Sequence, residues 1–139
     1  MENGAKITQK EKELLLRDLS ARLPYGVVCK GVTVDINVVK DEYENREVEG
    51  LLTNIGYDYC TLGIMTECEL NTIKPYLRPM SSMTEEEKKT YEMFFNEDGL
   101  LNTSIDTYLD WLLENHFDYR GLIKRGLAIE APEGMYNIK

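Results

Sequence analysis

The chain has 139 residues, of which 42% are hydrophobic, and a chain of this size can bury a core without disulfides or metal. Its formal net charge of −9 argues against direct binding to DNA or RNA, because proteins that bind phosphates need clustered Lys and Arg. The sequence has no apolar run as long as a membrane span and no signal-peptide pattern at its start, so we expect neither a membrane partner nor export.

The cysteines point to a reducing compartment. Cys29, Cys60 and Cys68 are an odd set with no close pair, which is typical of free thiols in a cytoplasmic protein rather than of a disulfide framework. A zinc site made of these three thiols and His116 is the alternative, but the spacing is too wide for the usual close ligand pairs. We therefore expect no metal and no cofactor.

The first predicted element is a helix that begins at Thr8. Thr8 and Glu11 form a capping box, in which each side chain bonds to the other residue's backbone amide. An apolar stripe at helical spacing follows, formed by Leu15, Leu16, Leu19 and Leu23. Four charged residues are expected on the other, exposed faces: Lys12, Arg17, Asp18 and Arg22.

From residue 27 the apolar period changes to two, which indicates strands. We expect strands at 27–30, 32–39, 48–55, 57–65 and 69–73, with the charged run 40–47 as an exposed hairpin loop. Several short strands joined by short turns favour a small antiparallel sheet. An SH3-like barrel is one form that this sheet could take, because a barrel removes exposed strand edges.

Pro75 and Pro79 mark a stiff connector, and a second capping box, Thr84 with Glu87, begins a helix. The aromatic stripe of this helix, Tyr91, Phe94 and Phe95, is expected in the core. A further helix is predicted from Thr103 or Ser104 to about 115, and a shorter one over 119–125 with Asp118 as its cap.

The pattern as a whole predicts an α+β protein. An N-terminal helix and a small sheet or barrel occupy residues 1–74, a proline hinge occupies 75–83, and about three helices occupy 84–139. Whether these parts pack as one compact domain stays open at this point.

One cluster of candidate catalytic residues occurs, at the end of the second of these C-terminal helices. His116, Asp118, Tyr119 and Arg120 place an imidazole, a carboxylate, a phenol and a guanidinium within five residues, as acid–base chemistry requires. A structural role explains them equally well, since Asp118 suits a cap and Arg120 could pair with Asp118 or Glu114. No phosphate-binding glycine loop, nucleophile elbow or HExxH pair accompanies them. If the residues have a function, we expect it where this turn folds back towards the hinge.

Tyrosine is the other candidate for recognition. Tyrosine offers rigid contact area with a polar tip, so a partner-binding face on the sheet is one interpretation, with an ordinary core-and-rim role as the other. The nine tyrosines include five on or near the predicted sheet: Tyr25, Tyr43, Tyr57, Tyr59 and Tyr76.

Three segments carry a resemblance: KEKELLLRDLSARLPYGV, IKPYLRPMSSMTEEEKK and DWLLENHFDYRGLIKRGLAIEAPEGMY. They resemble a family of small uncharacterised proteins from Bacteroidetes and related gut bacteria, often linked with phage-like or mobile elements. The resemblance covers both ends and the hinge but not the middle, 30–71. It implies a bacterial or phage cytoplasmic protein and no particular catalytic residue.

These observations favour a non-enzymatic protein-interaction or accessory protein of a phage-like element, with another protein as partner and a homo-oligomer possible. One alternative is an acidic protein that imitates nucleic acid and occupies a nucleic-acid-binding protein, which requires carboxylates spaced along one face. Another is a small enzyme that uses His116, Asp118 and Arg120, which requires those side chains to converge in a pocket.

Overall fold

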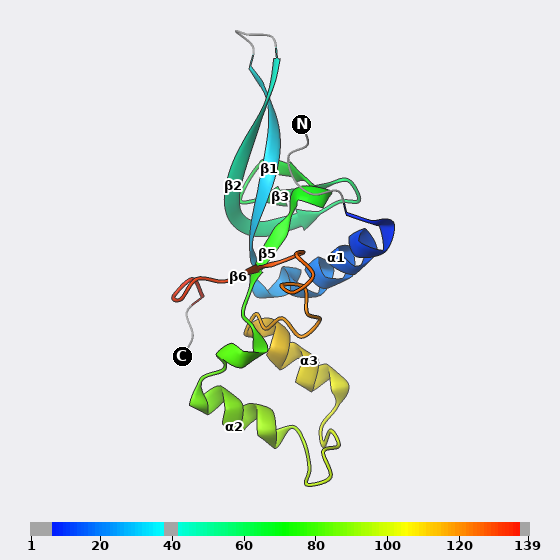
Figure 1. Ribbon diagram of the computed structural model, residues 1–139, viewed down its shortest axis with the longest axis vertical. Coiled ribbons are helices and arrows are strands. Elements are labelled where there is room, and N and C mark those ends of the chain that lie inside the picture. The colour runs from blue at the N-terminus through cyan, green and yellow to red at the C-terminus, as the bar shows by residue number, and fades with distance from the viewer. Residues whose placement is uncertain (1–6, 38–41, 137–139) are drawn as a thin grey trace.

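The computed structural model describes residues 7–37 and 42–136, apart from the side chains of 34–37 and 42–44. It has helix α1 (Gln9–Arg22), then five strands, then helices α2 (Glu85–Met93) and α3 (Ile105–Glu114), and last a sixth strand that completes a mostly antiparallel sheet. The α+β class is confirmed. Figure 1 shows an elongated molecule in which α1 lies between the sheet and the α2–α3 pair. No helix in the described part of the chain has the length and apolar character to cross a membrane.

The predicted capping box of α1 is present, because the Thr8 Oγ1 accepts from the Glu11 amide and the Glu11 carboxylate accepts from the Thr8 amide. The helix ends in the short 3-10 helix η1 (Leu23–Tyr25), followed by Gly26 in the left-handed conformation. The prediction for the charged face is wrong in two places. Asp18 and Arg22 are both fully buried.

The sheet has the strand order β4-β3-β2-β1-β5-β6, in which all neighbours are antiparallel except β5 and β6. The strands are β1 (Val28–Asn37), β2 (Glu42–Ile55), β3 (Tyr59–Leu62), β4 (Thr66–Glu69), β5 (Lys74–Leu77) and β6 (Ile129–Glu130). The two strands predicted at 27–30 and 32–39 are thus one.

The charged run predicted as a loop is mostly strand. β2 begins at Glu42 and continues through Glu47 in register with β1, while residues 38–41 lie outside the described part of the chain. Within this run the described side chains, those of Asn45, Arg46 and Glu47, are all exposed, so they show no alternation of buried and exposed positions. In Figure 1 the ribbon extends beyond the rest of the sheet.

The sheet curls so that β4 approaches β1, while the SH3-like barrel stays a prediction. A Cβ atom on Gly31 of β1 would lie 2.9 Å from the Cys68 Sγ of β4. The predicted strand at 69–73 is instead the 3-10 helix η2 (Leu70–Thr72), and its Thr72 hydroxyl accepts from the Val32 amide at 3.0 Å. This turn connects the end of β4 to β1 and brings the chain into β5.

The main core lies inside the curled sheet, beneath α1 and the segment that precedes β6. Buried members from these elements are Leu15, Leu19, Val27, Cys29, Leu52, Cys60, Leu62, Cys68, Leu70, Ile73, Leu77, Leu122, Leu127 and Ala128. Pro75 belongs to a paired strand rather than to a connector, because it lies opposite Cys29. The division of the chain at 75–83 stays a prediction.

After β5 the chain forms the 3-10 helix η3 (Met80–Ser82), then α2 and α3. The Thr84–Glu87 capping box, the Ser104 cap and the left-handed Gly99 are all present as predicted. The helix predicted over 119–125 is a single turn instead. Gly121 and Gly126 take left-handed conformations, at φ 73° and 78°, at the two ends of this turn. The helix therefore cannot continue into a second turn.

Candidate functional site

The turn that carries the candidate catalytic residues lies against the hinge, as the sequence analysis expected. The Arg78 amide donates to the His116 carbonyl oxygen at 2.8 Å, and the Asp118 amide donates to the Arg78 carbonyl oxygen at 2.8 Å. Arg78 therefore pairs with Phe117 as a parallel bridge. These bonds fix the backbone of the turn from which the side chains of the four candidates extend: His116, Asp118, Tyr119 and Arg120.

His116 is buried and packs face to face with Tyr136, with ring centroids 3.6 Å apart. Burial, with a smaller contribution from the guanidinium groups of Arg22 and Arg78, lowers its pKa from 6.5 to about 4. Its Nδ1 has no hydrogen-bond partner among the described residues. The imidazole is neutral at pH 7 and is a poor proton acceptor for catalysis.

Asp118 is used as a cap. Its two carboxylate oxygens accept from the amides of Leu122 and Ile123, at 2.8 and 2.9 Å. These bonds satisfy two backbone donors of the turn that replaces the predicted helix. Both carboxylate oxygens are therefore occupied within the turn itself.

Arg120 points to α1 rather than to Asp118 or Glu114. Its Nε lies 3.2 Å from the Asp18 Oδ1, as an ion pair without hydrogen-bond alignment, and its guanidinium lies 5.0 Å from the centre of the Tyr119 ring. The four candidates therefore do not converge. His116 takes part in a ring stack, Asp118 in a cap and Arg120 in an ion pair, while the Tyr119 ring packs against the Arg120 guanidinium.

Asp18 and Arg22 were missed by the sequence analysis and are the most deeply buried charges. The Arg22 Nε donates to the Asp18 Oδ2 at 2.7 Å, and the Arg22 Nη2 donates to the Phe117 carbonyl oxygen at 2.8 Å. A signal was present, because positions 15, 18, 19 and 22 share one helix face and two of them are Leu.

A groove of about 610 Å³ lies between the hinge and the C-terminal tail. Its lining residues, which come from the described part of the chain, include Arg78, Thr84, Glu133 and Tyr136 but none of the four candidates. Arg78 is already engaged, since its guanidinium donates to both Glu87 carboxylate oxygens at 2.7 and 2.8 Å. These bonds lower the pKa of Glu87.

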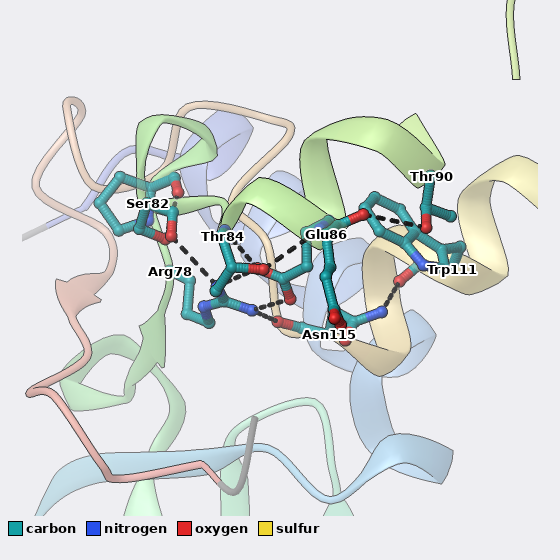
Figure 2. Close-up of polar contacts among 9 residues, drawn as sticks. Arg78, Ser82, Thr84, Glu86, Thr90, Trp111 and Asn115 are labelled. Carbon is teal, nitrogen blue, oxygen red and sulfur yellow. Dashed lines mark hydrogen bonds and ion pairs between the residues drawn. The ribbon is translucent and has the colours of Figure 1, made fainter. Parts of the chain in front are cut away.

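Arg78 also ties the α2–α3 pair to the sheet. Its guanidinium donates to the carbonyl oxygens of Ser82 and Asn115, both at 3.3 Å. Figure 2 shows this side chain between the start of α2 and the end of α3. One buried arginine therefore joins β5, η3, α2 and α3.

The cysteines and tyrosines give no common site. Cys29, Cys60 and Cys68 are buried free thiols, and the described residues contain no group of three or more His, Cys, Asp or Glu side chains that could hold a metal ion. Among the tyrosines, Tyr57 and Tyr59 are exposed, whereas Tyr76 is buried and donates to Glu49. Tyr25 faces Asp110 of α3, and the Tyr43 side chain lies outside the described part. Among the five tyrosines, the exposed ones with described side chains are thus Tyr57 and Tyr59.

The other unusual surface is formed by α2, α3 and the loop between them, residues 85–114, which we call the acidic hairpin. It contains nine acidic and two basic residues, a net charge of −7 out of the −9 of the whole chain. Glu87 is buried against Arg78, and the other eight acidic side chains are exposed. These eight are Glu85, Glu86, Glu92, Glu97, Asp98, Asp106, Asp110 and Glu114.

The acidic hairpin is held together by aromatic rings that are only half-buried. The predicted core residues Tyr91, Phe94 and Phe95 contact Tyr108 and Trp111 of α3, with ring centroids 5.5 to 6.4 Å apart. In α2, all of whose residues are described, only Glu87 is buried. These rings pack the two helices together outside the main core.

Comparisons with protein-family models, with curated proteins and with solved structures give no match for this chain.

Proposed function

We propose that this chain is a non-enzymatic protein-interaction module that binds a basic partner protein through the acidic hairpin. The observation that carries the proposal is the concentration of charge, since residues 85–114 hold a net −7 of the chain's −9 and expose eight carboxylates. Charge of a single sign on one element attracts an oppositely charged partner and speeds its association.

The contacts that the candidate catalytic residues make support a binding role over an enzymatic one. His116, Asp118 and Arg120 contact Tyr136, the 122–123 backbone and Asp18 respectively. Catalysis by these three residues requires their reactive atoms to surround one substrate position. Their separate partners argue against the enzyme alternative.

The resemblance of three segments to proteins of phage-like elements suggests the setting: an accessory protein in a bacterial cytoplasm, where free thiols such as Cys29 persist. Self-association through the acidic hairpin is disfavoured, because two copies would bring like charges together. A homo-oligomer, if it forms, uses another surface.

The test is affinity purification of the tagged chain from its host cell, with and without nuclease. We expect one stable, basic protein partner that is recovered equally under both conditions. Recovery of nucleic acid that nuclease removes, or of no protein above an untagged control, would contradict the proposal.

One observation favours the nucleic-acid mimic as a second candidate. Asp106, Asp110 and Glu114 occur every four residues along α3, so their Cα atoms form a row with a rise of about 6 Å per step. In this case the captured partner is itself a nucleic-acid-binding protein, and added duplex DNA should displace the chain from it. A partner that stays bound in the presence of excess DNA rules out this second candidate.

A further inference from the structure

The end of the acidic hairpin that is away from the sheet exposes large apolar side chains. We call residues 92–106 the distal tip. Met93 at the end of α2, Leu100 in the loop and Ile105 at the start of α3 are 76%, 64% and 56% exposed. Figure 1 shows these three places at the same end of the hairpin. Exposed apolar residues that gather in one region mark interaction surfaces more often than scattered ones do.

The charges around these residues indicate what can cover them. Glu92, Glu97, Asp98 and Asp106 are exposed at the distal tip, and the sequence has no Lys or Arg from 90 to 119. An anionic membrane, a nucleic acid or a second acidic tip would meet charge of its own sign. The complementary surface is apolar with positive charge at its rim.

The distal tip is formed before any partner binds. The Asn96 carboxamide oxygen accepts from the amides of Asp98 and Leu100, at 2.9 and 3.0 Å. Phe95 and Leu101 form an antiparallel bridge across the base of the loop, and Gly99 supplies the left-handed turn at φ 78°. A surface that is already ordered loses less conformational entropy on binding.

The chain contains a second exposed apolar pair that serves as a comparison. Ile64 and Met65 in the β3–β4 turn are 94% and 83% exposed. Few charged side chains surround this pair, since Glu67 of β4 is the one exposed charged residue between 59 and 73, a stretch that the structure describes throughout. The distal tip, by contrast, combines its exposed apolar residues with four exposed carboxylates, those of Glu92, Glu97, Asp98 and Asp106.

We propose that the distal tip binds a basic amphipathic helix of the partner protein, with apolar residues of that helix on Met93, Leu100 and Ile105 and its Lys or Arg side chains facing the surrounding carboxylates. Amphipathic helices bind apolar surfaces through residues at positions i, i+3 or i+4 and i+7. This inference rests on the proposed function and names the class of partner and the place where it binds.

The probe is a fluorescent peptide of Leu and Lys, about 18 residues long, with Leu at helical spacing. A peptide of the same composition in scrambled order is its control. Fluorescence anisotropy with the full chain should show affinity about tenfold higher for the amphipathic peptide, a difference of about 1.4 kcal/mol. Equal binding of the two peptides, or no binding, would overturn the inference.

Apolar and charged variants locate the site. Met93→Ser with Ile105→Ser should weaken peptide binding about tenfold, whereas Ile64→Ser with Met65→Ser should leave it unchanged. Glu92→Lys with Glu97→Lys should also weaken peptide binding about tenfold. Its control is Glu13→Lys with Glu67→Lys, which changes the net charge by the same amount at exposed positions outside the distal tip and should weaken binding less. Equal losses in test and control variants mean nonspecific attraction and would refute the assignment.

The salt dependence of binding distinguishes an apolar contact at the distal tip from the purely electrostatic binding of a nucleic-acid mimic. Binding to the apolar residues should persist in part when salt is raised from about 50 to about 500 mM, because salt screens charges but not apolar contact. Complete loss at high salt contradicts the inference. If a protein partner is captured from cells but the variants leave its recovery unchanged, this inference fails and the proposed function stands. If no partner is captured, the proposed function itself fails.

Discussion

Among the described residues, His116 is the one residue other than glycine that has a positive φ. It takes a left-handed backbone conformation at φ 63°, which few residues other than Gly, Asn, Asp and His adopt. Its ring is buried on Tyr136, and burial together with Arg22 and Arg78 lowers its pKa to about 4. The chain has one histidine, so the proton that a histidine takes up on unfolding between pH 7 and 5 belongs to this residue.

We expect the free energy of unfolding to fall as pH decreases from 7 to 5. The unfolded histidine, with a pKa of about 6.5, binds a proton in this range, while the folded one, with a pKa of about 4, does not. The unfolded state is thereby favoured, by about 2 kcal/mol at pH 5. Urea unfolding followed by circular dichroism at several pH values measures this loss.

The control for this prediction is His116→Asn, because Asn tolerates the left-handed conformation and has no group that titrates near neutral pH. Its stability should change little between pH 7 and 5. An equal pH dependence in the variant would show that His116 is not the cause.

At the scale of elements, the closure of the sheet depends on Gly31. A Cβ atom at this position would lie 2.8 Å from the Ile73 Cδ1 and 2.9 Å from the Cys68 Sγ. These distances are shorter than packed atoms allow, so β4 and the residue before β5 approach β1 closely because residue 31 has no side chain.

Gly31→Ala should therefore lower the free energy of unfolding by about 1–3 kcal/mol through overpacking. Gly50→Ala is the matched control, because a Cβ atom there would lie 3.6 Å from the Leu62 Cβ, an ordinary contact. Addition of Ile73→Val to Gly31→Ala removes the Cδ1 atom and should restore part of the loss. Urea denaturation compares the four proteins, and equal stability of Gly31→Ala and Gly50→Ala would contradict the close approach.

At the scale of the whole molecule, a buried arginine of the first helix joins that helix to the C-terminal segment. Arg22 of α1 contacts Asp18 and the Phe117 carbonyl oxygen, which is 95 residues further along the chain. The tail adds a second connection, since the Tyr136 hydroxyl donates to the Tyr76 carbonyl oxygen and accepts from the Val28 amide. The C-terminal segment therefore bonds to both α1 and the sheet.

Asp18→Leu should lower the free energy of unfolding by about 3–5 kcal/mol, because it leaves the Arg22 charge buried without its counter-ion. Asp18→Leu with Arg22→Met removes both charges and should be less destabilised than the single variant. Unfolding followed by both circular dichroism and the fluorescence of Trp111, the single tryptophan, provides the measurement. A double variant no more stable than the single one would show that the buried charge is not the cause.

Local signals were sufficient to predict much of the secondary structure. The boxes at Thr8 and Thr84, the Ser104 cap and the turn at Gly99 were predicted because their partners lie within about four residues. The curled sheet followed from short alternating strands. The charged part of β2 was missed because its described side chains, at 45–47, are all exposed and so do not alternate with buried ones.

By itself the sequence determined the α+β class, the helix starts and the acidic character of residues 85–114, since these depend on composition and near neighbours. Only the tertiary structure decided that Asp18 and Arg22 are buried, that His116, Asp118 and Arg120 have separate partners, and that Met93, Leu100 and Ile105 stay exposed. Burial depends on which distant segment covers a side chain, as Phe117 meets Arg22, and periodicity along one helix contains no information about that segment.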